Sequence, residues 1–116
     1  MTSLLFAYGT LMPPDPVAAT ARGWWPDAVR GRLYDLGPYP ALIDLDNPQA
    51  GWVLGYCGPV EPQELERHDR WEEVDAGVYS RVETLTRNNH RAWVYVFSRP
   101  LPADARGPLD RWRPTA

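Results

Sequence analysis

Two short segments that lie far apart in the chain carry the residues best suited to chemistry. The first is Tyr-Gly-Thr-Leu at residues 8–11, which follows an apolar run at residues 4–7. This pattern predicts a buried strand ending in a tight turn, whose N–H groups can converge on an anion or a carbonyl oxygen. The second is Asp-Arg-Trp-Glu at residues 69–72, which places a carboxylate beside an aromatic residue. Together they offer oxyanion donors and an acid–base group, which acyl transfer requires.

Each segment also has a plainer interpretation. The first is then only a turn, in which Gly9 allows backbone conformations that other residues avoid. In the second, Glu72 lies with Asp69, Glu73 and Asp75 in a solvated acidic loop. If Glu72 is instead buried beside the preceding tryptophan, the pKa of its carboxyl rises toward neutrality and suits a general base or acid.

Short elements are expected to position these segments. Apolar patterning predicts strands at 3–8, 27–36 (broken by a glycine at 31), 41–45, 51–58, 78–86 and 91–98. The last of these is apolar on both faces, which places it at the centre of a sheet or in a barrel wall. Helices are predicted at 15–22 and 62–71, the second with a thin apolar face formed by Leu65 and Trp71.

These elements indicate an α+β fold, namely a small, mostly antiparallel β-barrel or strongly curved sheet with short peripheral helices. We assign residues 1–98 to this domain. Residues 99–116 contain four prolines and four arginines, and we interpret them as a tail that lies over the domain or is disordered. Trp112 is the residue in this tail that can anchor it.

Composition limits the class of protein. The chain has 116 residues, a net charge of −3 and no lysine, and its length suits one domain. The arginines are scattered, which argues against nucleic-acid binding, and no apolar stretch reaches the ~18 residues of a membrane span. We therefore expect a cytoplasmic protein that binds neither nucleic acid nor membrane. The oligomeric state is not readable from the sequence.

The single cysteine, Cys57, excludes an internal disulfide and is more typical of a small buried hydrophobe than of a nucleophile. A cysteine hydrolase that uses Cys57 with His68 or His90 is an alternative, although nothing in their spacing favours it. With so few Cys and His residues, a zinc site of that type is not expected.

The order of the motifs resembles the γ-glutamylcyclotransferase-like family, also described as avirulence-induced-gene-like. The resemblance covers roughly residues 4–98 and rests on four motifs. They are Tyr8-Gly9-Thr10-Leu11, Gly37-Pro38-Tyr39-Pro40-Ala41, Asp69-Arg70-Trp71-Glu72 and Tyr79-Ser80-Arg81.

The resemblance implies a β-barrel whose cavity is flanked by the first motif and faced by Glu72. The implied reaction is intramolecular: the α-amine of a γ-glutamyl group attacks its own γ-carbonyl, 5-oxoproline forms, and an amine or amino acid leaves. No cofactor or metal is implied. Glu72 is the implied catalytic residue, and the small-molecule γ-glutamyl substrate is expected to contact the remaining site residues. These are Tyr8, Gly9, Thr10, Leu11, Tyr39 and Tyr79.

The sequence leaves four points open. Glu73 stands where the family more often has glycine, which bears on the geometry of the loop and on the orientation of Glu72. Arg81 either pairs with an acidic neighbour or binds a substrate carboxylate, and structural pairing is preferred. A non-catalytic module that binds a small molecule or another partner on the same fold is the alternative to an enzyme. The identity of the leaving amine is not encoded in any motif.

Overall fold

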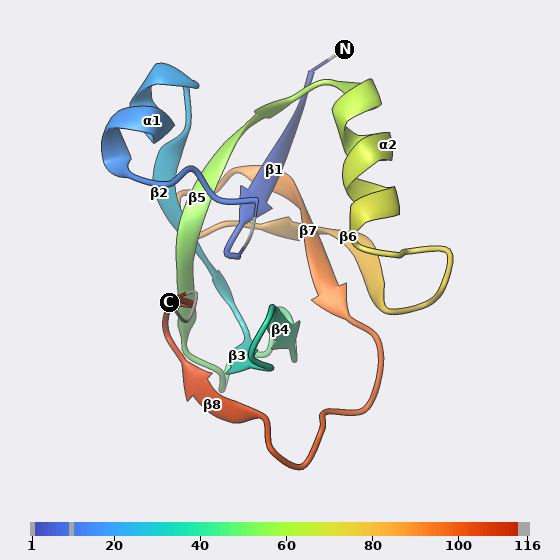
Figure 1. Cartoon of the computed structure of the whole chain (residues 1–116). Helices are drawn as coiled ribbons and strands as arrows, with labels where there is room; N and C mark the ends of the chain where they lie inside the picture. Colours follow the sequence, from blue (N-terminus) through green and yellow to red (C-terminus); the bar gives the residue numbers. More distant parts are fainter. Residues whose placement is uncertain (1, 10, 114–116) are drawn as a thin grey trace.

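The computed structural model describes residues 2–9 and 11–113, which form eight strands and two helices (Figure 1). The strands are β1 (Ser3–Ala7), β2 (Trp25–Arg30), β3 (Arg32–Asp35), β4 (Pro40–Ile43), β5 (Trp52–Val60), β6 (Tyr79–Leu85), β7 (Arg91–Phe97) and β8 (Arg106–Leu109). The helices are α1 (Pro16–Ala21) and α2 (Pro62–Trp71). Every strand predicted from the apolar pattern is present, with ends shifted by one or two residues.

The larger sheet has five strands in the order β2-β5-β1-β7-β6. Neighbouring strands run antiparallel except β1 and β7, which are parallel and meet at Leu5 and Trp93. Strand β7 therefore has a partner on each side, as its two apolar faces predict. Because β1 is central, the turn that follows it lies among other elements, where its backbone can contribute to a site.

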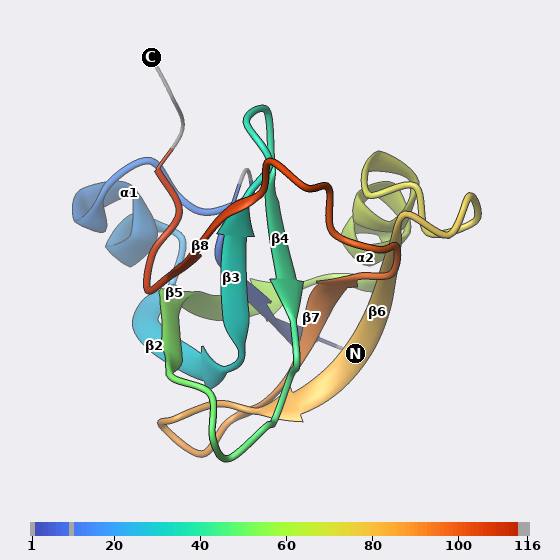
Figure 2. The ribbon, with the colours of Figure 1, turned by 90° about the horizontal axis from the view of Figure 1, so that it is seen from below.

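A second sheet of three antiparallel strands, in the order β4-β3-β8, packs beside the first (Figure 2). The chain passes from β2 to β3 through Gly31, the predicted break. A Cβ at Gly31 would lie 2.7 Å from Leu42 Cδ1, so the close approach of β4 requires glycine there. The mixed, mostly antiparallel α+β arrangement is as predicted, but the two sheets are not closed on themselves, and the expected barrel is not confirmed.

Both helices begin at the predicted signals. Asp15 caps α1, accepting a hydrogen bond from the Ala18 N–H at 2.8 Å, and Pro16 occupies the first turn. A capping box of Glu61 and Glu64 starts α2, whose bounds match the prediction. Within the described ranges, no helix has the length and apolar character needed to cross a membrane.

The apolar residues form two core clusters, one of which includes both Cys57 and Trp112. Cys57 is fully buried, as its interpretation as a small hydrophobe predicts.

Trp112 is 4% exposed, so it anchors the C-terminal segment, and residues 106–109 pair with β3 as strand β8. This strand was not predicted. The boundary at residue 98 stays a prediction, although residues 106–112 pack on the rest of the fold.

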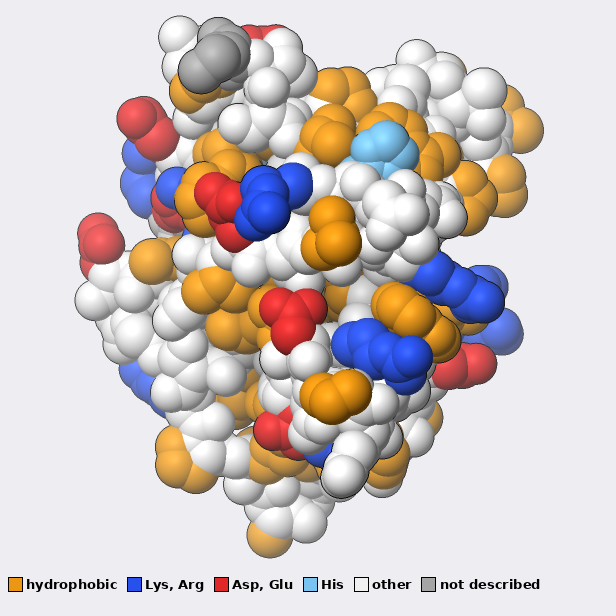
Figure 3. All heavy atoms as spheres, turned by 180° about the vertical axis from the view of Figure 1, so that it is seen from behind, with side chains coloured by type: hydrophobic (Ala, Val, Ile, Leu, Met, Phe, Trp, Pro, Cys, Tyr) orange, Lys and Arg blue, Asp and Glu red, His pale blue; other side chains and the backbone are white. Residues whose placement is uncertain are grey.

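Charged side chains are spread over the surface. On the face seen in Figure 3, arginine and acidic side chains of the described residues alternate in small groups among apolar ones. Trp52 lies between two arginines, with the Arg30 and Arg87 guanidinium carbons 4.3 and 5.3 Å from its ring centroid.

Candidate functional site

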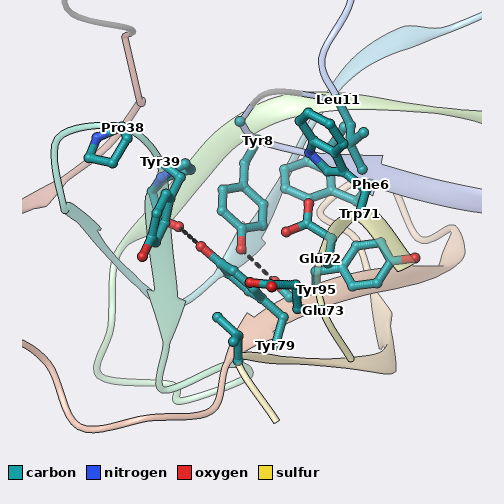
Figure 4. A pocket seen from close by; sticks show the side chains of 14 residues that line it. Phe6, Tyr8, Leu11, Pro38, Tyr39, Trp71, Glu72, Glu73, Tyr79 and Tyr95 are labelled. Carbon is teal, nitrogen blue, oxygen red and sulfur yellow. Dashed lines mark hydrogen bonds between the residues drawn. The ribbon is translucent and has the colours of Figure 1, made fainter. Parts of the chain in front are cut away.

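A cavity of about 190 Å³ lies between β1, the loop before β4, the end of α2, and strands β6 and β7 (Figure 4). It brings together the two chemistry-bearing segments that are distant in the sequence. Aromatic side chains form much of its wall: Phe6, Tyr8, Tyr39, Trp71, Tyr79 and Tyr95. An apolar wall of this kind excludes water and raises the energy of any charge placed against it.

The carboxyl of Glu72 lies at this cavity (Figure 4). Glu72 is the C-cap residue of α2, and its N–H donates to the carbonyl of His68 at 2.8 Å, so the helix end determines where the side chain projects. Burial raises the pKa of the Glu72 carboxyl from 4.5 to about 7. Glu73 and Asp75 of the same acidic loop are exposed, whereas Glu72 is partly buried. The carboxyl is suited to exchanging protons near neutral pH.

The helix end that carries Glu72 has the hydrogen bonds of a Schellman motif. The N–H of Glu73 donates to the carbonyl of Arg70 (3.2 Å), and the N–H of Val74 donates to that of Asp69 (3.0 Å). Glu73 has a φ of 53°, in the left-handed region that glycine favours. The position where the family more often has glycine thus keeps a glycine-like conformation. Glu73 lines the cavity beside Glu72.

Two of the wall tyrosines donate their hydroxyl protons to main-chain carbonyls. Tyr8 Oη donates to the carbonyl of Tyr95, and Tyr79 Oη donates to the carbonyl of Pro40. Burial raises the pKa of both phenols, so both stay protonated near neutral pH. Their single protons are committed to these carbonyls, and each oxygen faces a ligand only as an acceptor. The first bond therefore joins the end of β1 to β7, and the second joins β6 to β4.

Gly9 follows Tyr8 in the turn after β1, and its carbonyl accepts a hydrogen bond from the N–H of Met12 at 3.0 Å. Its φ is not in the left-handed region, so the expectation of an unusual backbone conformation is wrong. Glycine is needed for space: a Cβ would lie 2.6 Å from Pro40 Cγ. Leu11 lines the cavity. Thr10, also predicted as a substrate contact, lies outside the described residues.

Tyr39 lies at the rim of the cavity. It is 41% exposed, and its ring meets that of Tyr79 edge-on at a centroid distance of 6.3 Å. The loop that carries it is closed by a hydrogen bond from the Leu36 N–H to the Tyr39 carbonyl at 3.0 Å. Asp35 supports the same loop by accepting hydrogen bonds from the Gly37 N–H (2.8 Å) and Trp112 Nε1 (3.3 Å). The C-terminal segment thus helps to place the rim.

With this geometry established, comparison with known proteins identifies the family. The family model described as "Gamma-glutamyl cyclotransferase, AIG2-like" matches residues 5–114. The chain belongs to this family. A search of curated proteins found no match.

Solved structures support the same fold for this AIG2-like chain. An AIG2-like protein from Mus musculus is 17% identical with a TM-score of 0.74, over 97% of this chain and 88% of that one. An uncharacterised protein from Pyrococcus horikoshii is 18% identical with a TM-score of 0.65, over 89% and 84%. YkqA from Bacillus subtilis is 19% identical with a TM-score of 0.64, over 84% of this chain but 36% of that one. At these identities the likeness concerns the fold.

Several cavity residues were not predicted as part of the site. Tyr95 was placed on one face of strand 91–98, but nothing local indicated that this face meets the cavity. Trp71 was expected to pack the helix against the core, yet it is 68% exposed and forms part of the cavity wall. The carbonyl of Pro40 acts through its backbone, which no side-chain pattern reveals. All three depend on long-range packing.

The alternative chemistries receive no support from the geometry. The Cys57 thiol is fully buried in the core and its pKa is raised to about 12, chiefly by burial, so a thiolate is strongly disfavoured. His90 packs against Trp25, with ring centroids 4.8 Å apart and the ring planes tilted by 50°. Across residues 2–9 and 11–113, no three His, Cys, Asp or Glu side chains are grouped in a way that could hold a metal ion.

Proposed function

We propose that this AIG2-like protein is a γ-glutamylcyclotransferase-type enzyme that releases 5-oxoproline and a free amine or amino acid from a γ-glutamyl substrate. The observation that carries the proposal is the carboxyl of Glu72, with a pKa near 7, in the same cavity as Tyr8, Gly9 and Leu11. Family membership supports the reaction class. We further propose that Glu72 is the catalytic residue.

Proton transfer by Glu72 follows from the matched pKa values. An unperturbed α-ammonium has a pKa of about 7.7–8, close to that of the buried carboxyl. Glu72 takes a proton from the substrate ammonium, and the freed amine attacks the γ-carbonyl carbon. The C–N bond to the leaving group breaks as Glu72 returns a proton to the departing nitrogen. The attacking nitrogen loses a second proton as the lactam forms, and Glu72 passes this proton to the released amine as well. One of the three ammonium protons therefore stays on the lactam nitrogen, and two leave on the amine, which departs as an ammonium ion.

The turn after β1 is proposed to stabilise the negative charge on the carbonyl oxygen. N–H groups of Gly9 and Leu11 are the donors we assign, with Thr10 between them. One preorganised donor of this kind is worth on the order of 100-fold in rate. The wall formed by Tyr8, Tyr39 and Tyr79 would fold the glutamyl chain so that amine and carbonyl meet. An intramolecular reaction gains much of its rate from such positioning.

The test is to incubate the purified protein with a panel of γ-glutamyl amines and γ-glutamyl amino acids and to measure 5-oxoproline. The variant Glu72→Gln keeps the shape of the side chain but cannot exchange a proton, so turnover should fall by at least about 100-fold. Glu66→Gln, on an exposed part of α2, is the matched control and should remain fully active.

Two results would overturn the proposal. Full turnover by Glu72→Gln would show that another group transfers the proton. A panel in which γ-glutamyl ligands raise the melting temperature but yield no 5-oxoproline would instead identify a non-catalytic binding module.

A further inference from the structure

An ion pair lies directly behind the cavity, between α2 and the sheet. Asp69, one helical turn before Glu72, receives two hydrogen bonds from Arg81 on β6. Arg81 Nε lies 2.7 Å from Oδ1 and Nη2 lies 3.0 Å from Oδ2. This two-point geometry is the strongest arrangement available to an arginine and a carboxylate. Both side chains are about three-quarters buried, with 24% and 26% exposed. The preferred expectation that Arg81 pairs with an acidic neighbour is therefore confirmed.

Tyr95 links this ion pair to the cavity. Its hydroxyl donates to Asp69 Oδ1 at 2.6 Å, while its ring lines the cavity (Figure 4). Its main-chain carbonyl accepts the hydrogen bond from Tyr8. The guanidinium carbon of Arg81 lies 4.4 Å from the ring centroid of Trp93, which holds the arginine from a second side. The end of α2 is thus attached to β6 and β7, and through Tyr8 to β1.

We propose that Asp69 and Arg81 are positioning residues for Glu72. Their ion pair holds the last turn of α2 against the sheet, with the hydroxyl of Tyr95 bound to the same carboxylate, and so keeps the Glu72 carboxyl withdrawn from solvent at the cavity. Any effect on turnover rests on the proposed function, but the effect on the titration of Glu72 does not.

The phenols that act on Glu72 across the cavity are uncharged near neutral pH. They are Tyr8 after β1, Tyr79 on β6 and Tyr95 on β7, and burial raises the pKa of each. Tyr39 before β4 and the exposed Glu73 also line the cavity. On α2, burial lowers the pKa of His68, which favours its neutral form, and the charge of Asp69 is paired with that of Arg81 on β6. Burial is the cause of the raised Glu72 pKa, so this pKa reports how far solvent is kept from the carboxyl.

Removing either partner should loosen the last turn of α2. In Asp69→Asn and in Arg81→Gln alike, the Glu72 carboxyl gains solvent, and its pKa falls from about 7 toward 4.5. We expect a downward shift of roughly half a pH unit or more in each variant. The double variant should show little further shift, because both substitutions remove the same attachment.

The direct experiment is a ¹³C NMR titration of the Glu72 side-chain carboxyl in each variant. Arg32→Gln is the matched control, because it breaks the ion pair between Arg32 and Asp44, whose atoms are 2.6 Å apart, on the other sheet. This control should leave the pKa of Glu72 unchanged. Shifts in opposite directions for Asp69→Asn and Arg81→Gln, which their unpaired charges alone would produce, or no shift in either although both fold, would overturn the proposal.

A conservative variant separates positioning from charge. Arg81→Lys keeps the positive charge but loses the two-point geometry. The Glu72 pKa should fall as it does in Arg81→Gln, although no charge is lost, while kcat falls several-fold with KM nearly constant. A purely structural role would lower the melting temperature of Arg81→Gln without displacing the pH profile, which would contradict the inference. If the downward pKa shifts appear but no variant yields 5-oxoproline, the proposed function fails and the inference on Glu72 stands.

Discussion

The raised pKa of Glu72 predicts that the protein is stabilised by removing this carboxyl. When folded, Glu72 titrates at about 7 rather than at the ordinary 4.5. Between these values the folded state holds a proton that the unfolded state has released, so stability falls as the pH rises through this window. Below about pH 4.5 the carboxyl is protonated in both states and there is no penalty. Above about pH 7 the penalty is complete.

The magnitude follows from the size of the shift. The difference between about 7 and 4.5 is 2.5 pH units, and each unit corresponds to 1.36 kcal/mol, which gives an upper limit of about 3.4 kcal/mol. Because Glu72 is only partly buried, solvent screening reduces this figure. We expect about 1–2 kcal/mol. Glu72→Gln, whose side chain is neutral at every pH, should therefore be more stable than the unsubstituted protein by this amount at pH 8 and equal to it near pH 4.5.

The assay is urea unfolding of both proteins at several pH values between 4.5 and 8.5. The quantity of interest is the difference between their free energies of unfolding, which isolates Glu72 from all other groups. Glu66→Gln removes a carboxyl from the exposed face of α2 and should follow the unsubstituted protein at every pH. The reasoning is refuted if the difference for Glu72→Gln is independent of pH, because the carboxyl would then titrate normally and the cavity would not desolvate it.

Two further changes test the helix end and the C-terminal segment. Glu73→Gly should raise the free energy of unfolding by about 1 kcal/mol, since glycine adopts the φ of 53° without strain. Glu73→Ala removes the same carboxylate but keeps a Cβ. If the free energy of unfolding measured in urea rose equally in Glu73→Ala and Glu73→Gly, the loss of charge, and not the backbone strain, would explain the effect. Trp112→Ala should cost about 3–5 kcal/mol because the side chain is buried in a core cluster. If the free energy of unfolding of Trp112→Ala were unchanged, the segment after residue 98 would be dispensable for stability.

Local signals in the sequence were enough to find most elements. Helix α2 has the predicted bounds because a proline, a capping glutamate and a following loop mark both ends within a few residues. Asn89, in the loop between the predicted strands 78–86 and 91–98, adopts a φ of 65°, which asparagine tolerates. Strand β8 was not predicted from the sequence because all four of its residues are exposed and show no alternation of apolar and polar residues. It exists through its pairing with β3, which is a long-range contact.

The site was predictable to the extent that its residues lie in short motifs. Glu72 and the turn at residues 8–11 could be linked only through family resemblance, because no local rule says that two segments so far apart share a cavity. Local patterning also could not reveal that the hydroxyls of Tyr8 and Tyr79 bind carbonyls from other strands. Gly9 was identified for the wrong physical reason. Its neighbour Pro40, which explains the need for glycine, comes from a distant loop.

The end of α2 combines two features that are unfavourable in isolation. Glu72 is a carboxyl desolvated by its surroundings, and Glu73 is a non-glycine residue with a left-handed backbone. Such features persist only where several neighbouring contacts hold the unfavourable conformation in place. Here the Schellman hydrogen bonds act on the backbone, and Arg81 and Tyr95 hold the Asp69 side chain. Without those contacts the last turn would relax and hydrate Glu72, returning its pKa toward 4.5. The pKa of Glu72 therefore reports how firmly this helix end is attached to the sheet.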